Sequence, residues 1–225
     1  MKVTCFLAIL PLSVLLSGCA NYQVGGYVQS GVQALLAGNN ETALAYFQTA
    51  AQQDPKYMYG GVVNQGVGVL SLLGRAQYLT RNYAQARQTL EKALAQNKTD
   101  NLARLYLGLT QARLGDNKAG LQNIEASMKR IIAWLNYLEG GGYADAGWDP
   151  GGAIRGSIND ALAMISSGKV DWNKLFVYGE SVGLGVERSE ANFRQQFIDS
   201  TRLWGPRDLI EKSQLHASKL RRSLS

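Results

Sequence analysis

Three segments of the chain repeat one spacing of small and large residues. They span residues 27–55, 70–98 and 104–132. Each has a glycine, a small residue twelve positions later, a large apolar residue four positions after that, and another small residue three positions further on. These positions are Gly31, Ala43, Phe47 and Ala50 in the first segment, Gly74, Ala86, Leu90 and Ala93 in the second, and Gly108, Gly120, Ile124 and Ser127 in the third.

The spacing suits pairs of helices that lie close together, because the small residues allow the approach and the large residue fills the seam. The offset from Ala86 to Gly120 is 34 residues. The pattern resembles the tetratricopeptide repeat (TPR), whose 34-residue unit is a pair of antiparallel helices. The resemblance implies an all-α chain, with a solenoid of about three hairpins over residues 24–139 and a C-terminal helical extension. Unrelated helical hairpins remain the alternative.

The repeats also differ from one another. The offset from Ala43 to Ala86 is 43, so nine residues are inserted around 58–66. We expect this insert to extend the next helix at its N-terminus, since one face of that helix would carry Val62, Gly66, Leu70 and Leu73. The last helix of the third repeat overruns its unit, and its apolar residues form a seam at Leu121, Ile124, Met128, Ile131, Leu135 and Leu138. Residues 153–225 are the candidate to cover this helix.

The first eighteen residues have the features of an export signal. Lys2 precedes an apolar run at residues 5–16, which is too short to span a bilayer as a helix. The run ends in Leu16-Ser17-Gly18-Cys19, which resembles the bacterial lipobox at all four positions. The resemblance implies a lipoprotein signal peptide over residues 1–18, cleavage before Cys19, and lipidation of the Cys19 thiol. A plain secretory signal is the alternative.

The use of cysteine agrees with an anchored exported protein. Cys5 would leave with the signal, so Cys19 would be the only cysteine of the mature chain. Ala20, rather than aspartate, follows it. By resemblance to the sorting rule of enteric bacteria, we expect a cell-envelope location in the outer membrane, facing the periplasm, with palmitate-type acyl chains as the membrane contact.

Composition limits the chemistry that the chain could perform. With one histidine and two cysteines, we expect no metal and no cofactor. The net charge of +6 falls to +5 without Lys2. Nucleic acid does not suit an exported lipoprotein, so the expected electrostatic partner is an anionic lipid face, lipopolysaccharide or an acidic protein, with a merely soluble surface as the alternative.

The C-terminal third is expected to be helical after a loop. Residues 140–152 include six glycines and form the predicted loop, which ends in Asp149-Pro150 as the cap of a helix. Gly168 would end that helix. Asp171 would cap a second helix carrying Trp172, Leu175, Phe176 and Val182, and a third would carry Phe193, Phe197, Ile198 and Trp204.

One motif raises the possibility of a small serine hydrolase. Gly179-Glu180-Ser181-Val182-Gly183 has the form G-x-S-x-G, and Asp199, Asp208 and His216 follow in the order of α/β-hydrolases. That chemistry needs a strand-to-helix elbow above a sheet, and no strand is predicted upstream. We therefore favour a helix whose two glycines permit close packing, and we expect no enzyme activity.

The TPR resemblance also implies a binding surface, because the first helices of such repeats line a concave groove. Carried over by position, the partner-binding residues are Ser71, Arg75, Tyr78, Leu105, Leu109 and Arg113. An apolar floor with two arginines suits a peptide with an acidic or carboxylate contact. The expected function is a lipid-anchored envelope adaptor or scaffold that binds other envelope proteins or peptides. The alternative is a structural subunit of a surface assembly whose groove is filled by its own C-terminal helices.

Overall fold

The computed structural model describes residues 13–60, 66–140 and 148–203, with side chains from residue 23 onward apart from 140, 197, 198 and 200–203. Within these ranges the backbone forms eight α-helices and two short strands. The helices are α1 (Ser13–Leu36), α2 (Asn40–Gln53), α3 (Val69–Leu79), α4 (Tyr83–Gln96), α5 (Asn101–Arg113), α6 (Asn117–Gly140), α7 (Ala153–Ser166) and α8 (Trp172–Leu203).

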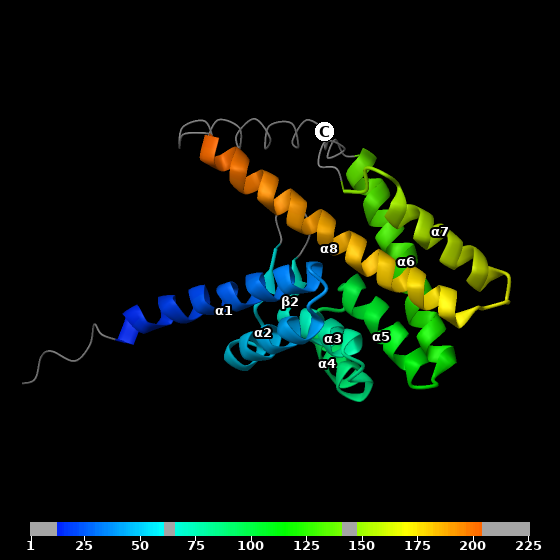
Figure 1. Cartoon of the computed structure of the whole chain (residues 1–225), viewed down its shortest axis with the longest axis horizontal. Helices are drawn as coiled ribbons and strands as arrows, with labels where there is room; N and C mark the ends of the chain where they lie inside the picture. Colours follow the sequence, from blue (N-terminus) through cyan, green and yellow to red (C-terminus); the bar gives the residue numbers. More distant parts are fainter. Residues whose placement is uncertain (1–12, 61–65, 141–147, 204–225) are drawn as a thin grey trace, which may run out of the picture.

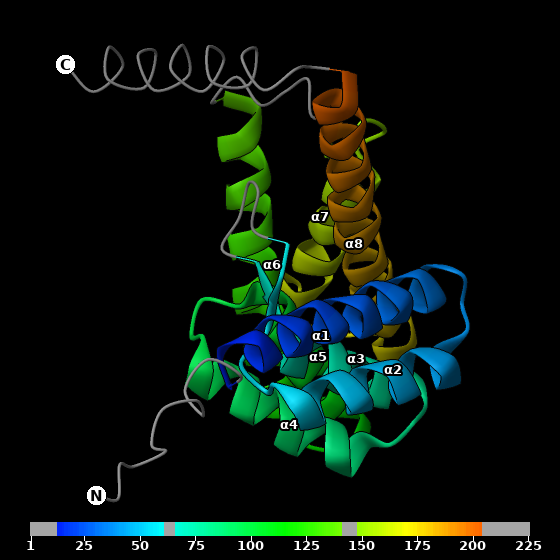
Figure 2. The same ribbon diagram turned by 90° about the vertical axis from the view of Figure 1, so that its left-hand side faces the viewer.

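The first six helices form three antiparallel hairpins that stack in chain order, α1 with α2, α3 with α4 and α5 with α6 (Figures 1 and 2). Helices α7 and α8 form a further antiparallel pair beyond them. The prediction of an all-α solenoid of about three TPR-like hairpins with a C-terminal helical extension is confirmed.

The repeated spacing predicted from the sequence produces the hairpin seams. Phe47 lies against Gly31, and Leu90 lies against Gly74. In the third hairpin the backbones themselves meet, because a Cβ added to Gly108 would lie 2.8 Å from the carbonyl oxygen of Gly120. Gly120 therefore stands where the other repeats have alanine, since a methyl group there would meet the facing helix.

The insert between the first two hairpins does not extend a helix, so that expectation was wrong. Met58–Tyr59 (β1) pairs antiparallel with Val67–Gly68 (β2), and α3 begins directly afterwards at Val69. Gly60 and Gly66 have φ angles of +81° and +76°, a left-handed backbone that favours glycine. Residues 61–65, which include Val62, lie outside the described residues.

The overrunning helix behaves as its seam predicted. In α6, Ile124, Met128, Ile131, Leu135 and Leu138 are all buried, while Leu121 at its start is half-buried. Helix α7 packs on this long helix, and α8 packs on α7. The part of the sequence proposed to cover α6 therefore does so through α7.

The capping residues of the last two helices differ in how well they were predicted. The expectation that Asp149-Pro150 caps this helix was wrong, because α7 begins at Ala153 and its N-cap is Gly152. The Asp149 carboxylate nevertheless accepts the backbone N–H groups of Ile154 and Arg155, both at 3.0 Å. Asp171 accepts the N–H groups of Asn173 and Lys174 at the start of α8, as expected. The expectation of two helices after Asp171 was wrong. One helix of 32 residues continues to Leu203. Its Leu175, Phe176, Val182 and Val186 are buried in the core, and Trp204 lies outside the described residues.

Candidate functional site

The concave face of the hairpin stack holds the C-terminal helix of the same chain. Helix α8 crosses this face and packs on α5, with further contacts to α1 (Figure 1). Two glycines of α8 allow the close approach. A Cβ added to Gly179 would lie 2.7 Å from Cδ2 of Leu109, and one added to Gly183 would overlap the ring of Tyr106. The interpretation of these glycines as a close-packing face is confirmed.

Acidic side chains of α8 pair with the two arginines that the sequence placed on this face. Arg75 forms an ion pair with Glu187, and the two side chains are 4% and 7% exposed. Arg113 lies 3.5 Å from Glu180, measured from Nη2 to Oε1. The Tyr78 hydroxyl donates to the same Glu180 oxygen at 2.7 Å. The guanidinium carbon of Arg113 also lies 3.5 Å from the centre of the Phe176 ring.

Burial controls the electrostatics of this contact. Desolvation lowers the pKa of the Arg75 guanidinium, an effect that the neighbouring Tyr106 hydroxyl and Glu180 oppose. Desolvation also raises the pKa of Tyr78 well above its ordinary value, and the hydrogen bond to Glu180 adds to the shift. Tyr78 is therefore a neutral hydrogen-bond donor. Removing one partner of a buried ion pair leaves an uncompensated charge, which makes the Arg75–Glu187 contact a strong determinant of where α8 lies.

The structure places the six predicted partner-binding residues in different settings. Ser71, Arg75, Tyr78, Leu105 and Leu109 are buried, and only Arg113 is substantially exposed, with 34% of its side chain accessible. Arg75, Tyr78, Leu109 and Arg113 contact α8. The acidic peptide that this surface suits is thus supplied by the chain itself. That any of the six contacts a partner stays a prediction.

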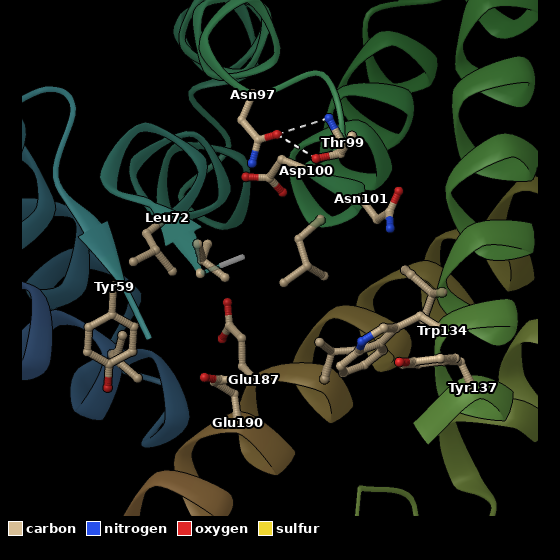
Figure 3. Close-up of a pocket in the computed structure, with 16 residues that line it drawn as sticks. Tyr59, Leu72, Asn97, Thr99, Asp100, Asn101, Trp134, Tyr137, Glu187 and Glu190 are labelled. Carbon is tan, nitrogen blue, oxygen red and sulfur yellow. Dashed lines mark hydrogen bonds between the residues drawn. The ribbon is translucent and has the colours of Figure 1, made fainter. Parts of the chain in front are cut away.

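Helix α8 leaves one part of the concave face open as a cavity of about 360 Å³ (Figure 3). Its walls come from α1, the β-hairpin, α3, the α4–α5 connection, α5, α6 and α8. Val32, Leu72, Leu102, Ile131 and Val186 make the lining mainly apolar. Trp134 and the exposed ring of Tyr137 project from α6 on one side, and Tyr59 lies on the opposite side.

Three carboxylates also line this cavity. They belong to Asp100, Glu187 and Glu190, and each residue is less than 9% exposed. Asp100 caps α5 by accepting the N–H of Ala103 at 2.8 Å, and it receives a hydrogen bond from the hydroxyl of Ser71. Desolvation nevertheless raises the pKa of the Asp100 carboxyl above its usual value. The cavity thus combines apolar walls with buried acidic groups.

Sequence reasoning missed the residues that give this cavity its chemistry. Asp100 could have been found, because an aspartate directly before a helical segment is a common N-cap. Glu187 and Glu190 carried no local signal, since a glutamate on a helix is ordinarily solvated and only the packing of α8 buries these two.

The serine motif does not form a nucleophile elbow. Ser181 lies in the middle of α8 and is exposed, and its hydroxyl is 3.4 Å from that of Ser157 on α7. The elbow of α/β-hydrolases places the serine between a strand and a helix, which is absent at this position. Asp199 is exposed near the end of α8. Asp208 and His216 lie outside the described residues.

The structure describes little of the predicted lipid anchor. Cys19 falls within the span of α1, and its side chain lies outside the described residues. No helix in the described ranges is both long and apolar enough to cross a bilayer. No group of three or more potential metal ligands occurs in that part of the chain. Lipidation of Cys19 stays a prediction.

Comparison with known proteins supports the repeat assignment. Residues 34–109 match the tetratricopeptide repeat family, which covers the chain from the end of α1 to most of α5. No curated protein matches the chain. Proteins with such repeats generally bind other proteins, commonly as adaptors or scaffolds. The hairpin geometry agrees with this match, so residues 34–109 are similar to tetratricopeptide repeats in both sequence and fold.

Proposed function

We propose that the protein is a lipid-anchored adaptor of the bacterial cell envelope, held in the outer membrane through Cys19, that binds a protein partner in the cavity of Figure 3. The cavity carries this proposal, because it is a hollow of the concave face in which described residues of the repeat helices stay accessible. The bound partner would be another envelope protein or peptide, and binding rather than catalysis is the activity.

The shape and chemistry of the cavity support protein binding. Its volume falls in the range of pockets that take ligand groups. Its floor is apolar, and the ring of Tyr137 is 69% exposed at the edge. Exposed aromatic rings beside an apolar depression are typical of binding surfaces, because they bury a large area at a small cost in side-chain entropy. An all-helical repeat fold is also typical of proteins without enzyme activity.

The anchor is supported by the sequence Leu16-Ser17-Gly18-Cys19 and by the short apolar run before it. Palmitate bearing an alkyne, fed to cells, should label the wild-type chain and not the Cys19→Ala variant. The variant should appear in the soluble periplasm or remain uncleaved. An unmodified Cys19 thiol on the mature wild-type chain, found by mass spectrometry, would refute the anchor.

A site-specific cross-linker tests the binding site. A photoreactive amino acid in place of Tyr137 should cross-link a partner in living cells. The matched control is the same amino acid in place of Gln85, an exposed residue of α4 that does not line the cavity. Cross-links from position 85 without any from position 137 would contradict the proposed site.

Cross-links from position 85 alone would support the second candidate function, a structural subunit of a surface assembly. The position of α8 favours this candidate, since a groove already filled by the chain's own helix leaves the outer faces for contact with neighbours. The buried pair of Arg75 and Glu187 holds α8 in place without any partner. The two functions therefore predict cross-links from opposite sides of the hairpin stack.

A further inference from the structure

The charge of the cavity lining points to the chemistry of its ligand. Asp100, Glu187 and Glu190 line it, and none of the other described lining residues is lysine, arginine or histidine. Three cations interact with these groups from outside the lining. Arg75 pairs with Glu187, Arg194 lies over the ring of Tyr59, and the charge of Arg104 acts on Asp100. Among the described lining residues the charged groups are therefore all acidic, and the low polarity of the walls strengthens their effect on a bound charge.

Glu187 is aimed into this cavity. Figure 3 shows its carboxylate directed from α8 toward the centre of the cavity. The side chain is 7% exposed, and its ion pair with Arg75 is made through Oε2. Oε1 is buried and accepts no hydrogen bond in the structure. A buried carboxylate oxygen without a donor is costly, so a ligand that brings a donor to this point would gain a strong, charge-assisted hydrogen bond.

The remaining lining suits a cation carried on an apolar stem. Lysine and arginine combine an apolar chain with a head that only donates hydrogen bonds. The stem would pack against the aliphatic walls, and the head would reach the carboxylates. The rings of Trp134 and Tyr137 offer aromatic faces, on which a guanidinium stacks well. Arg194 already makes such a contact, since its guanidinium carbon lies 4.5 Å from the centre of the Tyr59 ring.

We propose that the cavity binds a basic side chain, lysine or arginine, of the protein partner. This rests on the proposed function, and it specifies the chemistry of the binding partner. The concave face is then divided by charge. Its arginines hold the acidic residues of α8, and the acidic groups around Glu187 receive a basic residue of the partner. An acidic partner, expected from the sequence, would be repelled at this cavity.

A pair of peptides tests the proposal directly. The full mature chain with its anchor is placed in phosphatidylcholine nanodiscs, whose neutral surface does not attract basic peptides. Two labelled peptides, Ac-Ala-Leu-Arg-Leu-Ala-amide and the same peptide with citrulline for arginine, are titrated by fluorescence anisotropy. Citrulline keeps the shape of arginine and removes its charge. The arginine peptide should bind about tenfold more tightly, and empty nanodiscs should bind neither.

Neutral variants locate the binding. Glu190→Gln and Asp100→Asn keep the size of each side chain, and asparagine remains a good N-cap for α5. Each should weaken the arginine peptide several-fold and leave the citrulline peptide unchanged. Glu41→Gln, on the exposed surface of α2, is the matched control and should have no effect. Equal binding of the two peptides, tighter binding of a glutamate peptide, or no saturable binding would each overturn the proposal.

The cross-linking experiment separates this inference from the proposed function. With the photoreactive amino acid at position 137, addition of Glu190→Gln should reduce the yield of the cross-linked partner several-fold. An unchanged yield would refute the proposal that the cavity binds a basic side chain, and it would not contradict the adaptor function. Absence of any cross-link from position 137 would refute the proposed function, and the peptide titration would still decide the chemistry of the cavity.

Discussion

Replacing Gly183 with alanine tests whether α8 lies in the concave face. The new Cβ would be 2.7 Å from Cζ and 2.8 Å from Cε2 of Tyr106, closer than carbon atoms pack. Tyr106 is 1% exposed and belongs to the core, so its ring has little space into which to move. We therefore expect Gly183→Ala to force α8 away from α5.

The magnitude follows from comparison with a glycine in open surroundings. Gly156 in α7 is exposed, and a Cβ there meets nothing within 4 Å. Alanine gains about 1 kcal/mol over glycine in a helix interior, and this gain is common to both positions. The difference between the two variants thus isolates the overpacking cost, which is about 1–3 kcal/mol. For a domain of this size, the Tm values should differ by roughly 2–12 °C.

Thermal and urea unfolding followed by circular dichroism measure this difference. Gly156→Ala should be as stable as the wild type or slightly more stable, and Gly183→Ala should be clearly less stable than Gly156→Ala. Hydrogen exchange should locate the loss of protection to α8 and the face of α5 beneath it. Equal stability of the two variants would show that α8 does not lie against Tyr106, and the assignment of the filled groove would fail.

Three further predictions follow from individual buried groups. Leu135→Ala should lower the free energy of unfolding by about 2–5 kcal/mol because Leu135 is 1% exposed, whereas the exposed Asn136→Ala should change it by less than about 0.5 kcal/mol; equal urea midpoints would contradict the α6 seam. Glu187→Gln should cost about 3–5 kcal/mol by leaving Arg75 buried without a counter-charge, and adding Arg75→Met should recover most of that loss in a double-mutant cycle. Burial raises the pKa of Asp100 above its ordinary 3.8, so the folded state binds this proton more tightly and stability falls as pH rises between the two values. Asparagine does not titrate, so the free energy of unfolding of Asp100→Asn, measured in urea, should rise relative to that of the wild type as pH increases through this range. A relative fall over the same range would show that the pKa of Asp100 is lowered.

The sequence by itself was sufficient to predict the helical hairpins. Gly31 and Phe47, or Gly74 and Leu90, meet within one hairpin, so the spacing of their residues reports a contact between neighbouring helices. The α6 seam was predictable for the same reason, because burial repeats along one face of a single helix. The insert at 58–66 was misjudged, since its few apolar residues fit a helical face as well as a short hairpin.

The candidate site depended on tertiary structure. Arg75 and Arg113, which were chosen by their positions in the repeats, contact α8, and their binding of a partner stays a prediction. Their actual partners, Glu180 and Glu187, lie far away in the sequence and in a segment without repeats. No periodicity links such residues, because their contact exists only once α8 has packed. The cavity is what remains between α8, α6 and the β-hairpin, so its shape and charge were decided by the way in which separate elements pack together.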